Sequence, residues 1–269
     1  MEAFSEEKLA NSLRRSGADE ATIEFVLADV KAALFEGMST KRIYDLAFGL
    51  LRKSKLGHAA RYRLKKAMME MGPTGYPFEY FIGEVFKLKG FQTEIGQVLQ
   101  GHCVTHEVDV LATKGNQQHF VECKYYQSTG KNANVQVPMY IRSRVDDLIK
   151  FRKELPQFKD YQFQGWVATN TRFTGDAISF GECTGLNLLS WDYPVNKGLK
   201  EIIDAEHIFP ITVLTRMLNA EKHQLMDQGI VLCRQIMNNP EVLESIGMTT
   251  NRQEKICDEI RHLCTEPKR

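Results

Sequence analysis

The hydrophobic period of this chain changes repeatedly between residues 76 and 191, and that order restricts the folds that the region can form. The region begins with helical spacing, passes through three strand-like runs and a long amphipathic stretch, and closes with a strand, a short helix and a final strand. The predicted strands cover residues 91–99, 104–111, 119–126, 163–169 and 186–190, and the predicted helices cover residues 78–88, 135–155 and 174–183. We therefore predict an α/β domain (α+β for the whole chain) with a mixed central sheet, flanked by helical regions on either side in the sequence.

Charged residues interrupt the second and third predicted strands of this region. Asp109 lies near the end of an apolar run, and Glu122 and Lys124 lie two residues apart on the next run. Residues two apart in a strand point to the same face, so Glu122 and Lys124 should project together. The short gap between the runs allows a hairpin that places Asp109 beside them.

This arrangement indicates a candidate metal site. Two carboxylates that converge beside one ammonium group can hold a hard divalent cation such as Mg²⁺ or Mn²⁺ and polarise its bound water. That chemistry is suited to the hydrolysis of a phosphodiester. The simpler alternative is a surface ion pair on a solvated strand face, because a single acid-x-lysine triplet is common by chance.

Composition limits the partners and the location that we expect. The formal net charge is +1, so any binding to nucleic acid must come from local basic patches. The six cysteines are scattered and contain no C-x-x-C pair, which is typical of reduced thiols. No long apolar run or signal peptide is recognisable, so we predict a cytoplasmic protein without a membrane partner.

Two further pairs of residues complete a recognisable pattern. Phe78-Glu79 lies on the first predicted helix, and Gly90-Phe91 closes that helix eleven residues after the glutamate. Together with the acid on one strand and the acid-x-lysine on the next, this region resembles the PD-(D/E)XK nucleases, and in particular the Mrr-like restriction endonuclease domain. The resemblance implies a restriction-endonuclease-like core and a metal-dependent endonuclease that hydrolyses DNA.

The resemblance also implies roles for five residues. Asp109, Glu122 and Glu79 would bind the metal, and Lys124 would orient the attacking water. Gln136, at the start of the long helix, would face the site.

Other charged residues near this pattern have competing interpretations. Glu84 is a second acid on the first helix, but it points to a different face from Glu79. His106 could act as a base, although a structural role is favoured. Arg142 and Arg144, on the long helix, could bind phosphates or belong to a solvated helix face.

The flanking regions predict two more domains. Residues 1–72 resemble an ATP-cone, a regulatory module that binds ATP or dATP, although the basic β-hairpin with which that module opens has no counterpart here. Residues 73–195 form the predicted nuclease domain. Residues 205–269 are predicted to be helical, and the turn at 245–249 resembles a helix-hairpin-helix unit. The alternative is a small helical domain that serves only in packing or dimerisation.

The primary functional prediction is a Mg²⁺-dependent DNA endonuclease. The resemblance of the first domain to an ATP-cone implies that a nucleotide could regulate it. One alternative is a structure-specific nuclease of DNA repair or recombination. Another is a nucleotide-sensing, DNA-binding regulator that does not cut. Double-strand cleavage with one site per chain would favour a homodimer.

Overall fold

The computed structural model describes residues 4–54, 56–128 and 130–265. Its chain divides into two compact units, and each is described by itself. One unit is formed by residues 68–210 and 225–232 and contains the sheet. The other is helical and combines residues from both ends of the chain, namely 1–67, 211–224 and 233–269.

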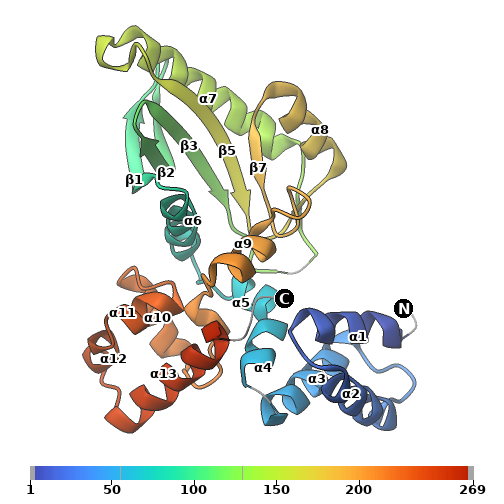
Figure 1. Ribbon diagram of the computed structural model, residues 1–269. Helices are drawn as coiled ribbons and strands as arrows, with labels where there is room; N and C mark the ends of the chain where they lie inside the picture. The colour runs from blue at the N-terminus through green and yellow to red at the C-terminus, as the bar shows by residue number, and fades with distance from the viewer. Residues whose placement is uncertain (1–3, 55, 129, 266–269) are drawn as a thin grey trace. The chain divides into compact units, whose positions relative to one another are not determined.

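The sheet unit is built on five strands in the order β1-β2-β3-β5-β7 (Figure 1). The first three strands are joined as antiparallel neighbours, whereas β3, β5 and β7 are parallel. The strands are β1 (Gln92–Gln100), β2 (Thr105–Lys114), β3 (Gln117–Lys124), β5 (Gln162–Thr169) and β7 (Asn187–Leu189). The mixed central sheet that the sequence predicts is therefore confirmed, with strand bounds close to those expected.

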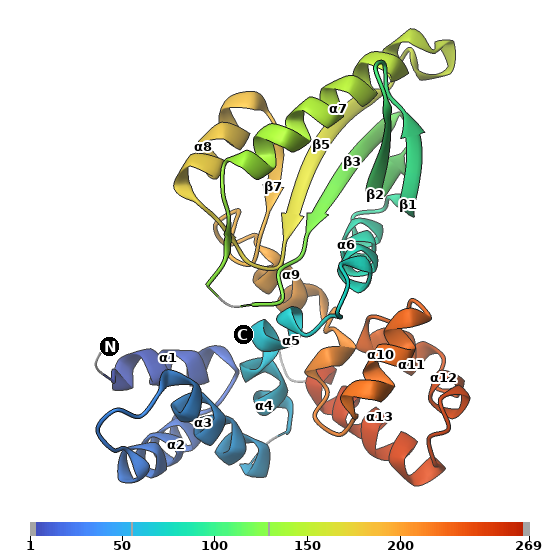
Figure 2. The same ribbon diagram turned by 180° about the vertical axis from the view of Figure 1, so that it is seen from behind.

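Helices cover both faces of this sheet (Figure 2). On one face, α7 (Gln136–Glu154) and α8 (Gly175–Thr184) pack on strand residues. Their shared core contains Phe120 and Leu111 from the strands and Ile141 from α7. On the other face lies α6 (Tyr76–Leu88), from which Phe86 contacts aromatic rings of the strands.

Close approach of backbone explains two glycines in this unit. An added Cβ at Gly83 on α6 would lie 2.8 Å from Ile95 Cδ1 of β1. An added Cβ at Gly165 on β5 would lie 2.9 Å from Val145 Cγ1 of α7. A larger residue at either position would therefore force the neighbouring side chain to shift.

Several small elements of the sheet unit were not predicted from the sequence. A two-stranded parallel pair joins β4 (Asn132–Ala133) to β6 (Arg172–Phe173). The short helix α9 (Leu199–Glu206) follows the last strand, and the 3₁₀ turn η1 (Pro156–Phe158) follows α7. Each is too short to leave a clear hydrophobic period.

The helical unit brings together helices from both ends of the chain. Ser5 caps the first helix by accepting from Lys8 N at 3.3 Å. The last helix packs on α4, where Arg61 donates to the carbonyl of Leu263 at 3.1 Å. The helices are α1 (Glu6–Arg15), α2 (Glu20–Ala33), α3 (Thr40–Ser54), α4 (Leu56–Tyr62), α11 (Cys233–Asn238), α12 (Glu241–Ser245) and α13 (Thr250–Thr265), with the 3₁₀ turn η2 (Ile211–Val213).

Two helices span the boundary between the units, α5 (Leu64–Met69) and α10 (Asn219–Asp227). The helical character predicted for both ends of the chain is confirmed. The predicted domain limits, 1–72, 73–195 and 205–269, stay predictions. Within the described residues, no helix is long and apolar enough to cross a membrane.

Candidate active site

The β2–β3 hairpin brings the two predicted strand acids together. Val110 of β2 pairs with Val121 of β3 in an antiparallel register. Just beyond this pair, Asp109 Oδ2 accepts a hydrogen bond from the backbone N–H of Cys123 at 2.6 Å. The carboxylate of Asp109 is therefore held against the backbone of the strand that carries the other candidate residues.

The acid and the lysine on β3 do share one face. Lys124 Nζ lies 3.1 Å from Glu122 Oε1, and the Glu122 side chain is only 11% exposed. This contact follows from the two-residue period of the strand. The predicted common projection of Glu122 and Lys124 is confirmed by this geometry.

The third candidate acid, Glu79, lies in the first turn of α6. Burial is the largest cause that raises its pKa to about 7, and the negative charges of Asp109, Glu107 and Glu122 contribute in that order. Burial, followed by the charge of Glu122, likewise raises the pKa of Asp109 to about 6. Carboxylates on a helix and on two strands therefore lie within electrostatic reach of one another.

Whether these acids suit a divalent cation depends on donor chemistry and on arrangement. Carboxylate oxygens are the hard donors that Mg²⁺ and Mn²⁺ prefer, and their mutual repulsion would be relieved by a dication. Within the described part of the chain, however, no group of three or more histidines, cysteines, aspartates or glutamates is already arranged to hold a metal. The donor set fits a metal in chemistry and charge, because one or two carboxylates with waters are enough to hold Mg²⁺.

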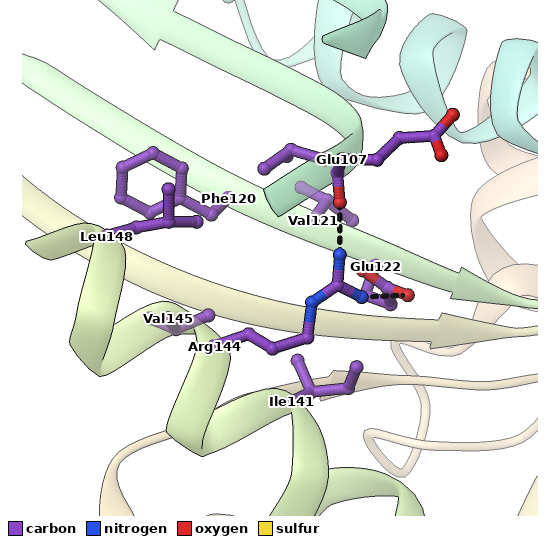
Figure 3. Close-up of a pocket in the computed structure, with 9 residues that line it drawn as sticks. Glu107, Phe120, Val121, Glu122, Ile141, Arg144, Val145 and Leu148 are labelled. Carbon is purple, nitrogen blue, oxygen red and sulfur yellow. Dashed lines mark hydrogen bonds and ion pairs between the residues drawn. The ribbon is translucent and has the colours of Figure 1, made fainter. Parts of the chain in front are cut away.

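Arg144 reaches from α7 to the strands that carry the candidate acids (Figure 3). Its guanidinium donates to Glu122 Oε1 at 2.7 Å and also to the carbonyl oxygen of Glu107. From the sequence, Arg144 could either bind a phosphate or lie on a solvated helix face, and the pattern did not distinguish the two. A usable signal was present, because Arg144 borders the apolar stripe that Ile141, Val145 and Leu148 form on the same helix.

Buried polar residues fix the end of the strand that carries Lys124. Thr169 donates its hydroxyl proton to the Lys124 carbonyl at 2.7 Å. Asn170, which is fully buried, accepts from Tyr126 N at 2.9 Å and donates to Tyr126 O at 2.8 Å. Asn170 also donates to Met68 O at 3.1 Å. Neither Thr169 nor Asn170 was identified from the sequence as a positioning residue.

The remaining candidates lie in different surroundings. Gln136 is exposed at the first position of α7, and its backbone N–H donates to Asn134 Oδ1 at 3.1 Å. The structure does not bring its side chain to the acids among the described contacts, so its role stays a prediction. Glu84 accepts from Lys87 at 2.7 Å, on the face away from Glu79, as expected. His106 pairs with Asp147 at 2.8 Å.

Two family models match the chain. Residues 71–192 match the model described as restriction endonuclease, Mrr_cat. Residues 209–264 match the model described as AF1548-like, C-terminal. The first match covers all of the candidate acids, Lys124 and Gln136.

Two relatives match much of the chain. An uncharacterised protein of Archaeoglobus fulgidus is 27% identical over 173 residues, which cover 64% of this chain and 93% of that protein. The crystal structure of the protein of unknown function AF1548 has 25% sequence identity and a TM-score of 0.59, and the match covers 71% of this chain and 98% of that one.

The sheet unit thus contains a restriction-endonuclease-like domain, and the predicted Mrr-like resemblance is confirmed over residues 71–192. A domain of this class points to a nuclease. The ATP-cone resemblance of residues 1–72 stays a prediction.

Proposed function

We propose that this chain is a metal-dependent endodeoxyribonuclease that hydrolyses phosphodiester bonds in DNA, with Mg²⁺ or Mn²⁺ as its cofactor. One observation carries the proposal. In a restriction-endonuclease-like domain, carboxylates from α6, β2 and β3 crowd together beside the ammonium group of Lys124.

The acids of the site would hold the metal. Asp109 and Glu122 supply carboxylate oxygens from neighbouring strands, and Glu79 supplies a third carboxylate from α6. When bound, the metal lowers the pKa of a coordinated water and stabilises negative charge on the phosphate. The hydrogen bond from Cys123 N keeps Asp109 oriented, so one ligand is positioned before any metal binds.

Lys124 would act on the reacting groups directly. Its side chain is 34% exposed, and the ammonium group can donate to the attacking water and offset the charge that builds on the phosphate. Thr169 and Asn170 support this role by fixing the backbone at the end of β3. Gln136 would assist from the start of α7.

DNA is the proposed partner, and cleavage of both strands by one site per chain would favour a homodimer. Regulation by ATP or dATP through residues 1–72 is a separate proposal that rests on the resemblance of that segment to an ATP-cone. Equilibrium dialysis of the full chain with ATP or dATP tests it, and absence of binding removes the effector.

The central test is cleavage of supercoiled plasmid DNA in the presence of Mg²⁺ or Mn²⁺. Lys124→Ala should lower the rate at least about 100-fold, because a positioned donor is lost at the point where charge develops. Glu79→Gln should also lower the rate. Glu84→Gln is the matched control, since it removes a carboxylate from the same helix but from a different face.

Equal cleavage by the wild type and by Lys124→Ala would sink the proposal. Binding of DNA without cleavage under any metal condition would favour the non-cutting regulator instead. Preference for branched or flapped substrates over linear duplex would favour the repair or recombination nuclease.

A further inference from the structure

Arg144 occupies a position that the proposed chemistry does not explain. Its side chain extends from α7 into the pocket between that helix and strands β2 and β3 (Figure 3). It is 16% exposed, which is low for an arginine. Arginine is seldom covered to this extent without a carboxylate partner, so the contacts that it makes there are informative.

The guanidinium contacts both strands of the candidate site. One nitrogen, Nη1, lies 2.7 Å from Glu122 Oε1 on β3. The other, Nη2, donates to the carbonyl oxygen of Glu107 on β2. The planar fork of arginine suits such paired contacts, whereas an ammonium group would act as a single point.

Glu122 Oε1 therefore accepts from two cations at once. Lys124 Nζ lies 3.1 Å from the same oxygen that Arg144 contacts at 2.7 Å. The positive charge of Arg144 also acts on Asp109, the neighbouring strand acid, where it opposes the effect of burial. One arginine and one lysine thus offset part of the negative charge of the site acids.

The neighbouring arginine of α7 shows that this arrangement is specific to position 144. Arg142 pairs with Asp146 at 2.5 Å, on its own helix, and donates to the carbonyl of Thr184 at 2.8 Å. It has no contact with the strand acids among the described interactions. Arg142 is thus a matched control for the loss of an arginine from α7.

We propose that Arg144 is a built-in counter-cation, a positioning residue that holds Glu122 in the metal-free protein and must release it before a divalent cation binds. The inference rests on the proposed function, because it assigns Glu122 as a metal ligand. Competition between the guanidinium and the metal for one carboxylate makes metal binding weaker than the acids alone would allow. The positive charge of Arg144 also reduces the repulsion between the site acids when no metal is bound.

The test is a calorimetric titration of the full-length protein with Mn²⁺, in the absence of DNA. Arg144→Gln keeps a polar side chain, although a shorter one, and removes the charge. It should bind Mn²⁺ about tenfold more tightly than the wild type, because the metal no longer displaces a cation. Arg142→Gln should leave the affinity unchanged.

A second variant and a second measurement keep the test decisive if Arg144→Gln folds poorly. Arg144→Lys retains one charge but loses the fork, so its affinity should lie between those of the wild type and Arg144→Gln. The Mn²⁺-dependent rise in Tm should follow the same order. Equal or weaker Mn²⁺ binding by both variants, relative to the wild type, overturns the role of Arg144.

The same titrations separate this inference from the proposed function. Glu122→Gln should weaken Mn²⁺ binding in both the wild-type and the Arg144→Gln background. If the wild type binds no Mn²⁺, or if Glu122→Gln leaves binding unchanged, the metal site itself is wrong. If Glu122 is needed but the Arg144 variants match the wild type, only the counter-cation is wrong.

Discussion

Two parts of this molecule bury carboxylates, and they surround them in opposite ways. In the helical unit, Glu259 on α13 is fully buried. Its oxygens accept from Thr215 N at 2.6 Å, Thr215 Oγ1 at 2.7 Å and Arg216 N at 3.0 Å. In the sheet unit, Asp109 and Glu79 lie among other acids, whose charges add to burial in raising their pKa values to about 6 and about 7.

The difference distinguishes a structural carboxylate from the candidate metal ligands. A buried acid that receives several neutral donors serves as a cap for the backbone that it contacts. An acid that repels its neighbours costs stability and remains in a sequence only if something else, such as a ligand, uses it. The predictions below test this distinction with substitutions that should have opposite effects.

The largest effect is expected at Glu259. Glu259→Ala would leave three partly buried donors of Thr215 and Arg216 without their acceptor and should lower the free energy of unfolding of the helical unit by about 2–4 kcal/mol. Denaturant unfolding measures the loss, and hydrogen exchange of the Thr215 and Arg216 amides locates it. Glu254→Ala, an exposed acid on the same helix, is the control. A change below about 1 kcal/mol would mean that this carboxylate is not the cap that its contacts indicate.

A smaller effect of opposite sign is expected at Glu79. Its pKa is raised in the folded protein, so the folded state keeps the proton to higher pH than the unfolded state does. The metal-free protein should therefore lose stability as the pH rises from about 4.5 to about 7. Glu79→Gln removes this loss and should raise stability at pH 7 by about 1–2 kcal/mol.

Thermal unfolding across that pH range, with a chelator present, measures the difference. Glu84→Gln should keep the slope of the wild type. If Glu79→Gln does not change the slope of stability against pH, the pKa of Glu79 is not raised by burial and its acidic neighbours. The contrast between Glu79 and Glu259 would then be wrong.

Local periodicity was enough to predict most of the sheet unit. The strand that carries Glu122 and Lys124 alternates apolar and polar residues, so their shared face follows from the two-residue period. The hairpin then limits where Asp109 can lie. The helix with Glu79 is marked by its own period and ends before Gly90. These are short-range properties, and each is encoded within a few residues.

Contacts between distant elements could not be predicted in the same way. The pairing of Arg144 with Glu122 depends on the rotation of α7 about its axis relative to the sheet, which no local pattern records. The anchoring of Tyr126 by Asn170 likewise joins segments 44 residues apart. Glu259 was not singled out at all, because its donors come from a turn that is distant in sequence.

The smallest effect is expected at Asp147 on α7, which has the donor-rich surroundings of Glu259 at a less buried position. It accepts from Cys103 N at 2.8 Å and Val104 N at 3.3 Å, and it pairs with His106. The hydrogen bond from His106 holds the pKa of Asp147 well below its usual range. The sign is therefore opposite to that of Glu79: the stabilisation is present above the unfolded pKa of about 4 and is lost as the pH falls through the folded value.

Asp147→Asn should speed amide exchange at Cys103 and Val104, because the turn loses a charged acceptor, while leaving the strand registers intact. It should also reduce the loss of stability in acid. Asp146→Asn, the neighbouring acid that pairs with Arg142, is the matched control and should not affect that turn. If both variants exchange like the wild type, water replaces the carboxylate at no cost, and donor number alone does not make a carboxylate structural. The contrast between Glu259 and the site acids would then depend on full burial, since Asp147 is 13% exposed and Glu259 is fully buried.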